Sequence, residues 1–101
     1  MDEASQAPYT LIFVDDEDVV RQGITSRIPW EENGFHLAGV FENGRSALEY
    51  LKHHKVDVVL SDISMPQMDG LTLSKEIAVA YPRTQVLLLT GFEEFEYAQE
   101  A

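Results

Sequence analysis

The sequence predicts an α/β fold in which a parallel sheet is doubly wound, with helices on both of its faces. Three short segments, 10–14, 56–60 and 85–90, are nearly continuous in apolar residues, as expected of strands that are covered on both faces. A weaker strand candidate, 36–41, lies between the first two segments. The intervening segments carry apolar residues at helical spacing. Strands and helices that alternate through right-handed crossovers form a sheet of this kind.

Each of the three predicted helices has an apolar face. Asn43 and Asp69 are start signals for the second and third helices, because short polar side chains cap helix N-termini. Gly34 and Pro82 are expected to mark the ends of the first and third helices. A last amphipathic stretch, 93–101, indicates a fourth helix. The apolar faces consist of Val20, Ile24 and Ile28 in the first helix, Ala47 and Leu51 in the second, and Leu73, Ile77 and Tyr81 in the third.

Length and composition limit the classes of protein to consider. The 101 residues suffice for one domain, expected over 9–101 and preceded by a flexible polar tail, 1–8. There are no cysteines, so disulfides and thiolate metal sites are excluded. No apolar run is long enough to span a membrane, and the start lacks the order of a secretory signal, so we expect a soluble cytoplasmic protein. The net charge of -11 disfavours nucleic acid and anionic membrane as partners and favours proteins or cations.

Acidic side chains follow the predicted strands at the points where they end. Asp15, Asp16, Glu17 and Asp18 follow the first strand, Ser61 and Asp62 the third, and Thr90 and Gly91 the fourth. Ligands of doubly wound sheets lie at these carboxyl ends. Clustered carboxylates repel one another unless a cation neutralises them, and a hard cation such as Mg²⁺ prefers oxygen ligands. With the metal present, one carboxylate can attack a phosphoryl donor and the Thr90 hydroxyl can donate to the transferred group. Glu17 or Asp18 is the expected N-cap of the first helix.

Three segments place these acids in a recognisable pattern: LIFVDDE at 11–17, VLSDISMPQMDG at 59–70 and LLLTG at 87–91. Together they resemble the receiver domain of two-component response regulators. Two further segments, IPWEENGF at 28–35 and GFEEFEYAQEA at 91–101, look like receivers attached to AraC-type DNA-binding domains. The resemblance implies a flavodoxin-like sheet with the strand order 2-1-3-4. It also implies a phosphoacceptor signalling domain rather than an enzyme.

The resemblance assigns roles to individual residues. It implies that Asp62 is the phosphoacceptor, and that Asp15, Asp16 and Asp62 hold Mg²⁺ together with the backbone carbonyl of Ser64. Thr90 would be the switch hydroxyl. The donor would be a phosphohistidine on a sensor histidine kinase, and the output would be a transcription-regulating domain. In the loop after the acceptor, Met65, Pro66 and Gly70 fit the family pattern; Pro66 would stiffen the loop and Gly70 would permit a backbone shape that other residues resist.

The family pattern continues beyond the fourth helix, in which this chain is expected to stop. A fifth strand, which ends in a lysine that pairs with the phosphoryl group, and a fifth helix are missing from the 101 residues, so we expect the receiver domain at 9–101 to be incomplete. Lys52, Lys55 and Lys75 fall on the second and third predicted helices, so none is expected to replace that lysine. The strand 85–90 would then lie at an edge of the sheet and could pair with a second chain.

Two other functions remain open. In a haloacid-dehalogenase-type phosphatase, whose signature fits residues 16–20, Asp16 would be the nucleophile and Asp18 the general acid. The domain could also be an interaction module that works without phosphorylation. The phosphatase and the receiver domain differ in the aspartate that carries the phosphate, which is Asp16 in the phosphatase and Asp62 in the receiver domain. His53 and His54 are interpreted as a solvated helix end rather than as ligands.

Overall fold

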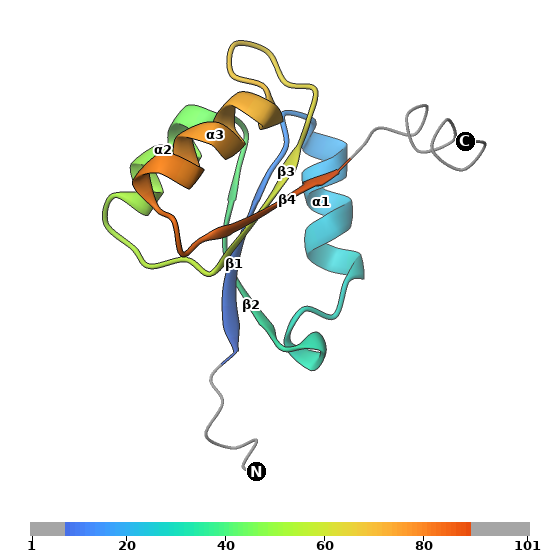
Figure 1. The fold of residues 1–101 in the computed structure, drawn as a ribbon. Coiled ribbons are helices and arrows are strands. Elements are labelled where there is room, and N and C mark those ends of the chain that lie inside the picture. Colours follow the sequence, from blue (N-terminus) through green and yellow to red (C-terminus); the bar gives the residue numbers. More distant parts are fainter. Residues whose placement is uncertain (1–7, 90–101) are drawn as a thin grey trace, which may run out of the picture.

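The computed structural model describes residues 8–89, which form a four-stranded parallel sheet and three α-helices (Figure 1). The strand order is β2-β1-β3-β4, which confirms the predicted α/β class and topology. Three predictions fall outside the described residues: the tail except for its last residue, Pro8, the fourth helix, and the position of Thr90. The strands are β1 (Tyr9–Val14), β2 (Phe35–Phe41), β3 (Val58–Asp62) and β4 (Gln85–Leu89), and the helices are α1 (Asp18–Arg27), α2 (Gly44–Leu51) and α3 (Gly70–Ala80), with a 3-10 turn, η2 (Glu31–Asn33).

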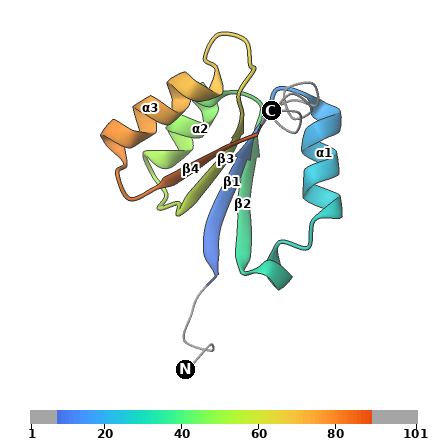
Figure 2. The same ribbon diagram turned by 45° about the vertical axis from the view of Figure 1, so that its right-hand side comes forward.

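The helices lie on two faces of the sheet. Figures 1 and 2 show α2 and α3 together on one face and α1 on the other. Within residues 8–89, every helix is too short or too polar to cross a bilayer. β4 pairs only with β3 in the described part of the sheet, as expected for an edge strand, and Leu87 on it is 54% exposed.

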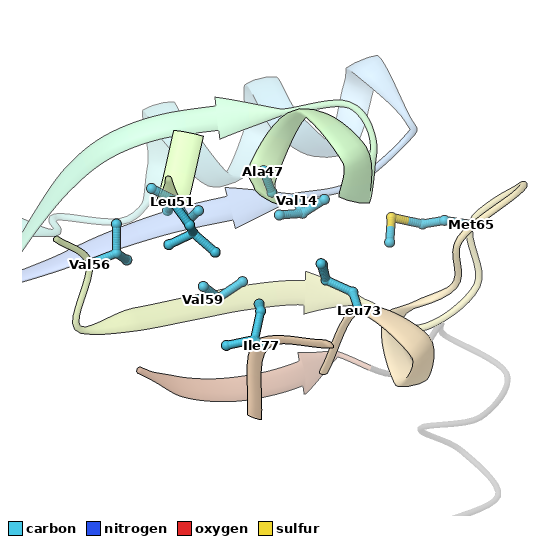
Figure 3. Packing of buried hydrophobic residues seen from close by; sticks show 9 residues of the cluster. Val14, Ala47, Leu51, Val56, Val59, Met65, Leu73 and Ile77 are labelled. Atoms are coloured by element: carbon cyan, nitrogen blue, oxygen red, sulfur yellow. The ribbon is translucent and has the colours of Figure 1, made fainter. Parts of the chain in front are cut away.

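The main core lies between the sheet and the pair α2 and α3. Figure 3 shows strand residues such as Val14 and Val59 meeting helix residues such as Leu73 and Ile77. Burial of apolar surface of this kind is the dominant force that stabilises a small domain. The predicted faces of the second and third helices are confirmed: Ala47, Leu51, Leu73 and Ile77 are buried, and Tyr81 is half-buried.

The prediction for the first helix is only partly right. Val20 and Ile24 are half-buried, but α1 ends at Arg27 and Ile28 is 36% exposed in an extended conformation. The reason is local, because a residue before proline is pushed out of the helical region, and Pro29 follows Ile28. Gly34 therefore does not end this helix. It adopts a left-handed conformation with φ 88° and closes η2 instead.

The capping signals of the other two helices are confirmed. The Asn43 side chain accepts a hydrogen bond from the Ser46 amide at 2.8 Å, and the Asp69 side chain accepts one from the Thr72 amide at 2.8 Å. α3 ends at Ala80, two residues before Pro82, as expected. The third strand runs two residues later than expected, over Val58–Asp62, so Asp62 is the last residue of the strand.

The junction between β3 and α3 depends on Gly70. Its amide donates to the Ile63 carbonyl at 2.8 Å, which brings the start of α3 against the end of β3. A Cβ at this position would lie 2.3 Å from the Asp62 carbonyl oxygen and 2.9 Å from the Ile63 Cα. Both contacts are with backbone atoms, so no flexible side chain could move aside.

We expect Gly70→Ala to lower the free energy of unfolding by about 3 kcal/mol, the upper end of the usual cost of overpacking. Urea denaturation followed by circular dichroism would measure it. Gly23→Ala is the matched control, because a Cβ at Gly23 would meet no atom within 4 Å. Since Gly23 lies in α1, that change should stabilise the chain by up to about 1 kcal/mol. Equal stability of the two variants would contradict this account of the junction.

Candidate functional site

Three carboxylates come together at the carboxyl ends of the two central strands. β1 and β3 are parallel neighbours, and Val14 pairs with Ser61. Asp15 and Asp16 follow directly after β1, and Asp62 is the last residue of β3. One carboxylate oxygen from each of the three residues lies within 4.8 Å of the others. Sequence reasoning placed these three side chains in one pocket, and the fold brings them there.

The three aspartates differ in burial. Asp15 is buried, Asp62 is half-buried and Asp16 is exposed. Burial is the main cause that raises the pKa of Asp15; the Glu17 amide, which donates to Asp15 Oδ1 at 2.8 Å, opposes it, and repulsion from Asp62 and Asp16 adds to the rise. A carboxylate with this pKa is easier to protonate than one in water, because its charge is poorly solvated.

Asp62 is perturbed in the same direction. Burial raises its pKa, the backbone amides of Ser64 and Ile63 oppose that rise, and the negative charges of Asp16 and Glu17 reinforce it. Among residues 8–89, no lysine, arginine or histidine forms an ion pair with any of the three aspartates. The negative charge of the cluster is therefore not balanced by the described side chains.

Arg21 supports the cluster from α1, and sequence reasoning did not single it out. Its Nη1 donates to the Asp15 backbone carbonyl at 2.7 Å, and its Nη2 lies 2.9 Å from Asp18 Oδ1. The guanidinium thus ties the first turns of α1 to the end of β1. Glu17 occupies the N-cap position of α1 but makes no side-chain capping bond, so the expected capping role is not seen for it. The acid–base spacing of Asp18 and Arg21 was the available sequence signal.

The loop after Asp62 combines exposed residues with one buried side chain and a tight turn. Ser64 is exposed, two residues beyond the acceptor candidate, and Met65 is buried in the core (Figure 3). Pro66 is exposed, and its carbonyl accepts a hydrogen bond from the Met68 amide at 2.8 Å. The residue between them, Gln67, has φ 71°, which is a strained conformation for a residue with a side chain. The sequence did not predict this conformation.

Gly70 closes this loop for a reason other than the expected one. Among the described glycines only Gly34 has a positive φ, so Gly70 does not adopt a backbone shape reserved for glycine. It is needed because a side chain would collide with the backbone of Asp62 and Ile63.

The remaining candidate residues lie elsewhere. Thr90, the expected switch hydroxyl, lies outside the described residues. Lys52 caps the C-terminus of α2, and Lys55 lies in the turn before β3, not on a helix as expected. Both are therefore at the end of the sheet opposite to the aspartates. Lys75 is exposed on α3.

The donor set fits a hard divalent cation. Mg²⁺ is bound in proteins by few carboxylates together with waters and phosphate oxygens. Asp15, Asp16 and Asp62 offer three carboxylates at close range. Mutual repulsion contributes to the raised pKa of Asp15 and of Asp62, so a cation is the natural counterion of the cluster. When bound, Mg²⁺ would neutralise the pocket so that a phosphate group could approach.

Comparisons with known proteins identify the family of this chain. Residues 11–101 match the family model of the response regulator receiver domain. The transcriptional regulatory protein YesN of Bacillus subtilis is 41% identical over 93 residues, which are 92% of this chain and 25% of that protein. The chain thus spans about a quarter of that relative.

Solved structures agree with this relationship. The receiver domain of AraT, a response regulator from Geobacillus stearothermophilus, is 42% identical with a TM-score of 0.77, over 92% of this chain and 72% of that one. A two-component transcriptional regulator AraC from Clostridium phytofermentans is 31% identical, with the same TM-score and coverage. The expected likeness to receivers of AraC-type regulators is confirmed, and the chain belongs to the response regulator receiver domain family.

Proposed function

We propose that this receiver domain accepts a phosphoryl group on Asp62 from a phosphohistidine of a sensor histidine kinase. The observation that supports it most directly is the cluster of Asp15, Asp16 and Asp62, with carboxylate oxygens within 4.8 Å of one another. In this proposal the three aspartates and the backbone carbonyl of Ser64 hold Mg²⁺. The site works by positioning and by neutralising charge, as other phosphoryl-transfer sites do.

The position of Asp62 suits the role of nucleophile. A carboxylate oxygen of Asp62 would attack phosphorus while the P–N bond to the histidine breaks and its electron pair returns to the imidazole. The half-buried Asp62 lies beside the amides of Ser64 and Ile63, which are donors at the place where charge is redistributed. Asp15 is less suited, because it is buried and its Oδ1 already accepts from the Glu17 amide.

The phosphatase alternative is weakened by the surroundings of Asp18. That reading needs Asp18 as a general acid, a role for a carboxyl that carries a proton. Asp18 Oδ1 instead lies 2.9 Å from Arg21 Nη2, and Asp18 is exposed. The Asp18 carboxyl is therefore already engaged by a side chain of its own helix. An interaction module that works without phosphorylation stays an alternative, and the first experiment below separates it from a phosphoacceptor.

The output of the whole protein is proposed from its relatives. YesN and the two solved relatives are described as transcriptional or response regulators. We infer that phosphorylation of Asp62 controls a transcription-regulating domain in the cytoplasm, with Thr90 as the hydroxyl that responds to the phosphoryl group. The domain itself would not bind nucleic acid, because its net charge is -11.

With Mg²⁺ and a small phosphodonor, or with beryllofluoride, the chain should form one covalent or mimetic adduct at Asp62. Asp62→Asn should abolish it, because an amide is not a nucleophile for phosphorus. Intact mass spectrometry would detect the phosphoryl group, and amide NMR spectra would detect beryllofluoride.

The matched control for this experiment is Asp18→Asn, which makes the same chemical change on exposed α1 and should keep the adduct. An adduct that survives Asp62→Asn but is lost in Asp16→Asn and Asp18→Asn would establish the phosphatase reading. No adduct in any form of the chain would favour the interaction module.

Mg²⁺ and pH should act on stability through the same cluster. Because the folded pKa values of Asp15 and Asp62 are raised, their contribution to the free energy of unfolding is complete below the ordinary carboxyl pKa of 3.8 and is lost as pH rises through the raised values. In chelator at pH 7, Asp62→Asn should therefore be more stable than the parent chain. Mg²⁺ at one hundred times its Kd should stabilise the parent by about 2.7 kcal/mol and the variant by much less.

Urea denaturation at several pH values, with Mg²⁺ or with EDTA, measures both effects. Asp69→Asn is a suitable control, since asparagine caps a helix as well as aspartate does and Asp69 lies outside the cluster. Equal stabilisation by Mg²⁺ of the parent and of Asp62→Asn would refute a metal site at these aspartates.

The edge strand β4 supports a further proposal, that the 101-residue chain self-associates through residues 85–90. β4 pairs with β3 on one side only in the described sheet, and Leu87 is 54% exposed. Light scattering should show mass that grows with concentration, and Leu87→Lys should reduce it, because charged edges resist pairing. Val79→Lys makes the same change on the exposed side of α3 and should not. A monomer at every concentration would contradict the proposal.

A further inference from the structure

A cavity of about 530 Å³ lies at the end of the sheet opposite to the aspartates. Two turns form it: the turn from α2 to β3 and the turn from α3 to β4, which lie far from the loop after Asp62 in Figures 1 and 2. A volume of this size falls within the range of pockets that hold small molecules, about 300–1,000 Å³.

The floor of this cavity, which we call the basal pocket, is apolar. Leu51 and Val56 are buried members of the core and appear at this end of it in Figure 3. Tyr81 is half-buried, and Pro82 adds an exposed ring. An apolar body placed here would lose contact with water without displacing a polar group of the protein.

The rim of the basal pocket is cationic, in contrast to the rest of the chain. Lys52, Lys55 and Arg83 line it, which are three of the chain's seven lysines and arginines. Lys52 pairs with Glu49 at 3.4 Å, but Lys55 and Arg83 form no ion pair within residues 8–89.

The other polar members of the lining have partners. His53 lies 3.7 Å from Glu49, and the ring of His54 stacks on Tyr50 with the centroids 4.0 Å apart. Among the described residues, Asp57 is the one carboxylate in the lining, and its Oδ2 accepts from the Thr10 amide at 2.8 Å. The two unpaired cations therefore face little competition from the protein's own acids.

Hydrogen bonds hold the two turns together. Thr84 Oγ1 donates to the Val56 carbonyl at 2.8 Å, and the Gln85 amide donates to the Asp57 carbonyl at 2.9 Å. Lys55 and Arg83, which are remote in sequence, each lie next to a residue of the first of these bonds. A cation pair whose backbone is fixed before a ligand arrives loses less entropy on binding.

Cations at the end of a helix are ordinary, because they offset the partial negative charge of the last carbonyls. That explanation accounts for Lys52, which follows α2 directly and pairs with Glu49. It does not account for Lys55, for Arg83, which comes from the other turn, or for the apolar residues that line the same cavity.

We propose that the basal pocket binds a small organic phosphate, a monoester with an apolar or aromatic body. The phosphate would lie between Lys55 and Arg83, since guanidinium and ammonium groups form strong charge-assisted hydrogen bonds with phosphate oxygens. The body would lie over Leu51, Val56 and Tyr81. A soluble ester is favoured over a lipid headgroup because the chain's net charge of -11 opposes an anionic membrane surface.

Phenyl phosphate is a suitable probe for the full chain, titrated in EDTA so that no metal brings phosphate to the aspartates. Amide NMR shifts should occur at residues 52–57 and 81–84 and not at 15, 16 or 62. Lys55→Gln and Arg83→Gln should each weaken binding about tenfold, as expected for one lost hydrogen bond to a charged group. Lys75→Gln removes the same charge from the exposed side of α3, outside the lining, and should leave binding unchanged.

Several outcomes would overturn the proposal. These are no binding at millimolar probe, equal weakening by Lys75→Gln, inorganic phosphate binding as tightly as the ester, or cosedimentation of the chain with phosphatidic acid vesicles. Thermal melts by circular dichroism would verify that the variants are folded. Asp62→Asn should bind the probe like the parent chain, so this test stands or falls independently of the phosphoacceptor.

Discussion

Repulsion among three carboxylates is the constraint on which the functional end of this domain depends. The parallel pairing of β1 with β3 places Asp15, Asp16 and Asp62 at one end of the sheet, although their negative charges repel one another. Burial disfavours the charged forms further and is the main cause of the raised pKa values of Asp15 and Asp62. The fold tolerates the cluster because the rest of the domain holds the strand ends in place, and the unbalanced charge is then available to a cation.

Support for the cluster comes from both faces of the sheet, by different means. On the face of α2 and α3, a packed core reaches the loop after Asp62 through Met65, and Gly70 lets α3 begin against the backbone of β3. On the other face α1 has no buried residue, and Arg21 links it to the Asp15 carbonyl by a hydrogen bond. One side of the site is thus fixed by packing and the other by a partly buried hydrogen bond.

The same topology separates charge along the sheet. Because all four strands are parallel, the connections that follow the strands gather at one end and those that precede them at the other. The acids follow β1 and β3, whereas Lys55 and Arg83 precede β3 and β4. A chain with an excess of acidic residues therefore carries an acidic cluster at one end of the sheet and a cavity with a cationic rim at the other.

The sequence by itself determined the presence and order of the strands, the starts of α2 and α3, and the membership of the aspartate cluster. These follow from short patterns: continuous apolar runs, the caps Asn43 and Asp69, and acids at strand ends. The early end of α1 at Arg27 was also encoded locally, by Pro29, but the apolar spacing of Ile28 predicted a longer helix. Only the tertiary structure decided that Arg21 holds the Asp15 carbonyl, that Gly70 is needed for close approach rather than for its φ, and that Arg83 joins Lys55 at one pocket. These facts depend on which distant segments meet and how closely, and packing sets both.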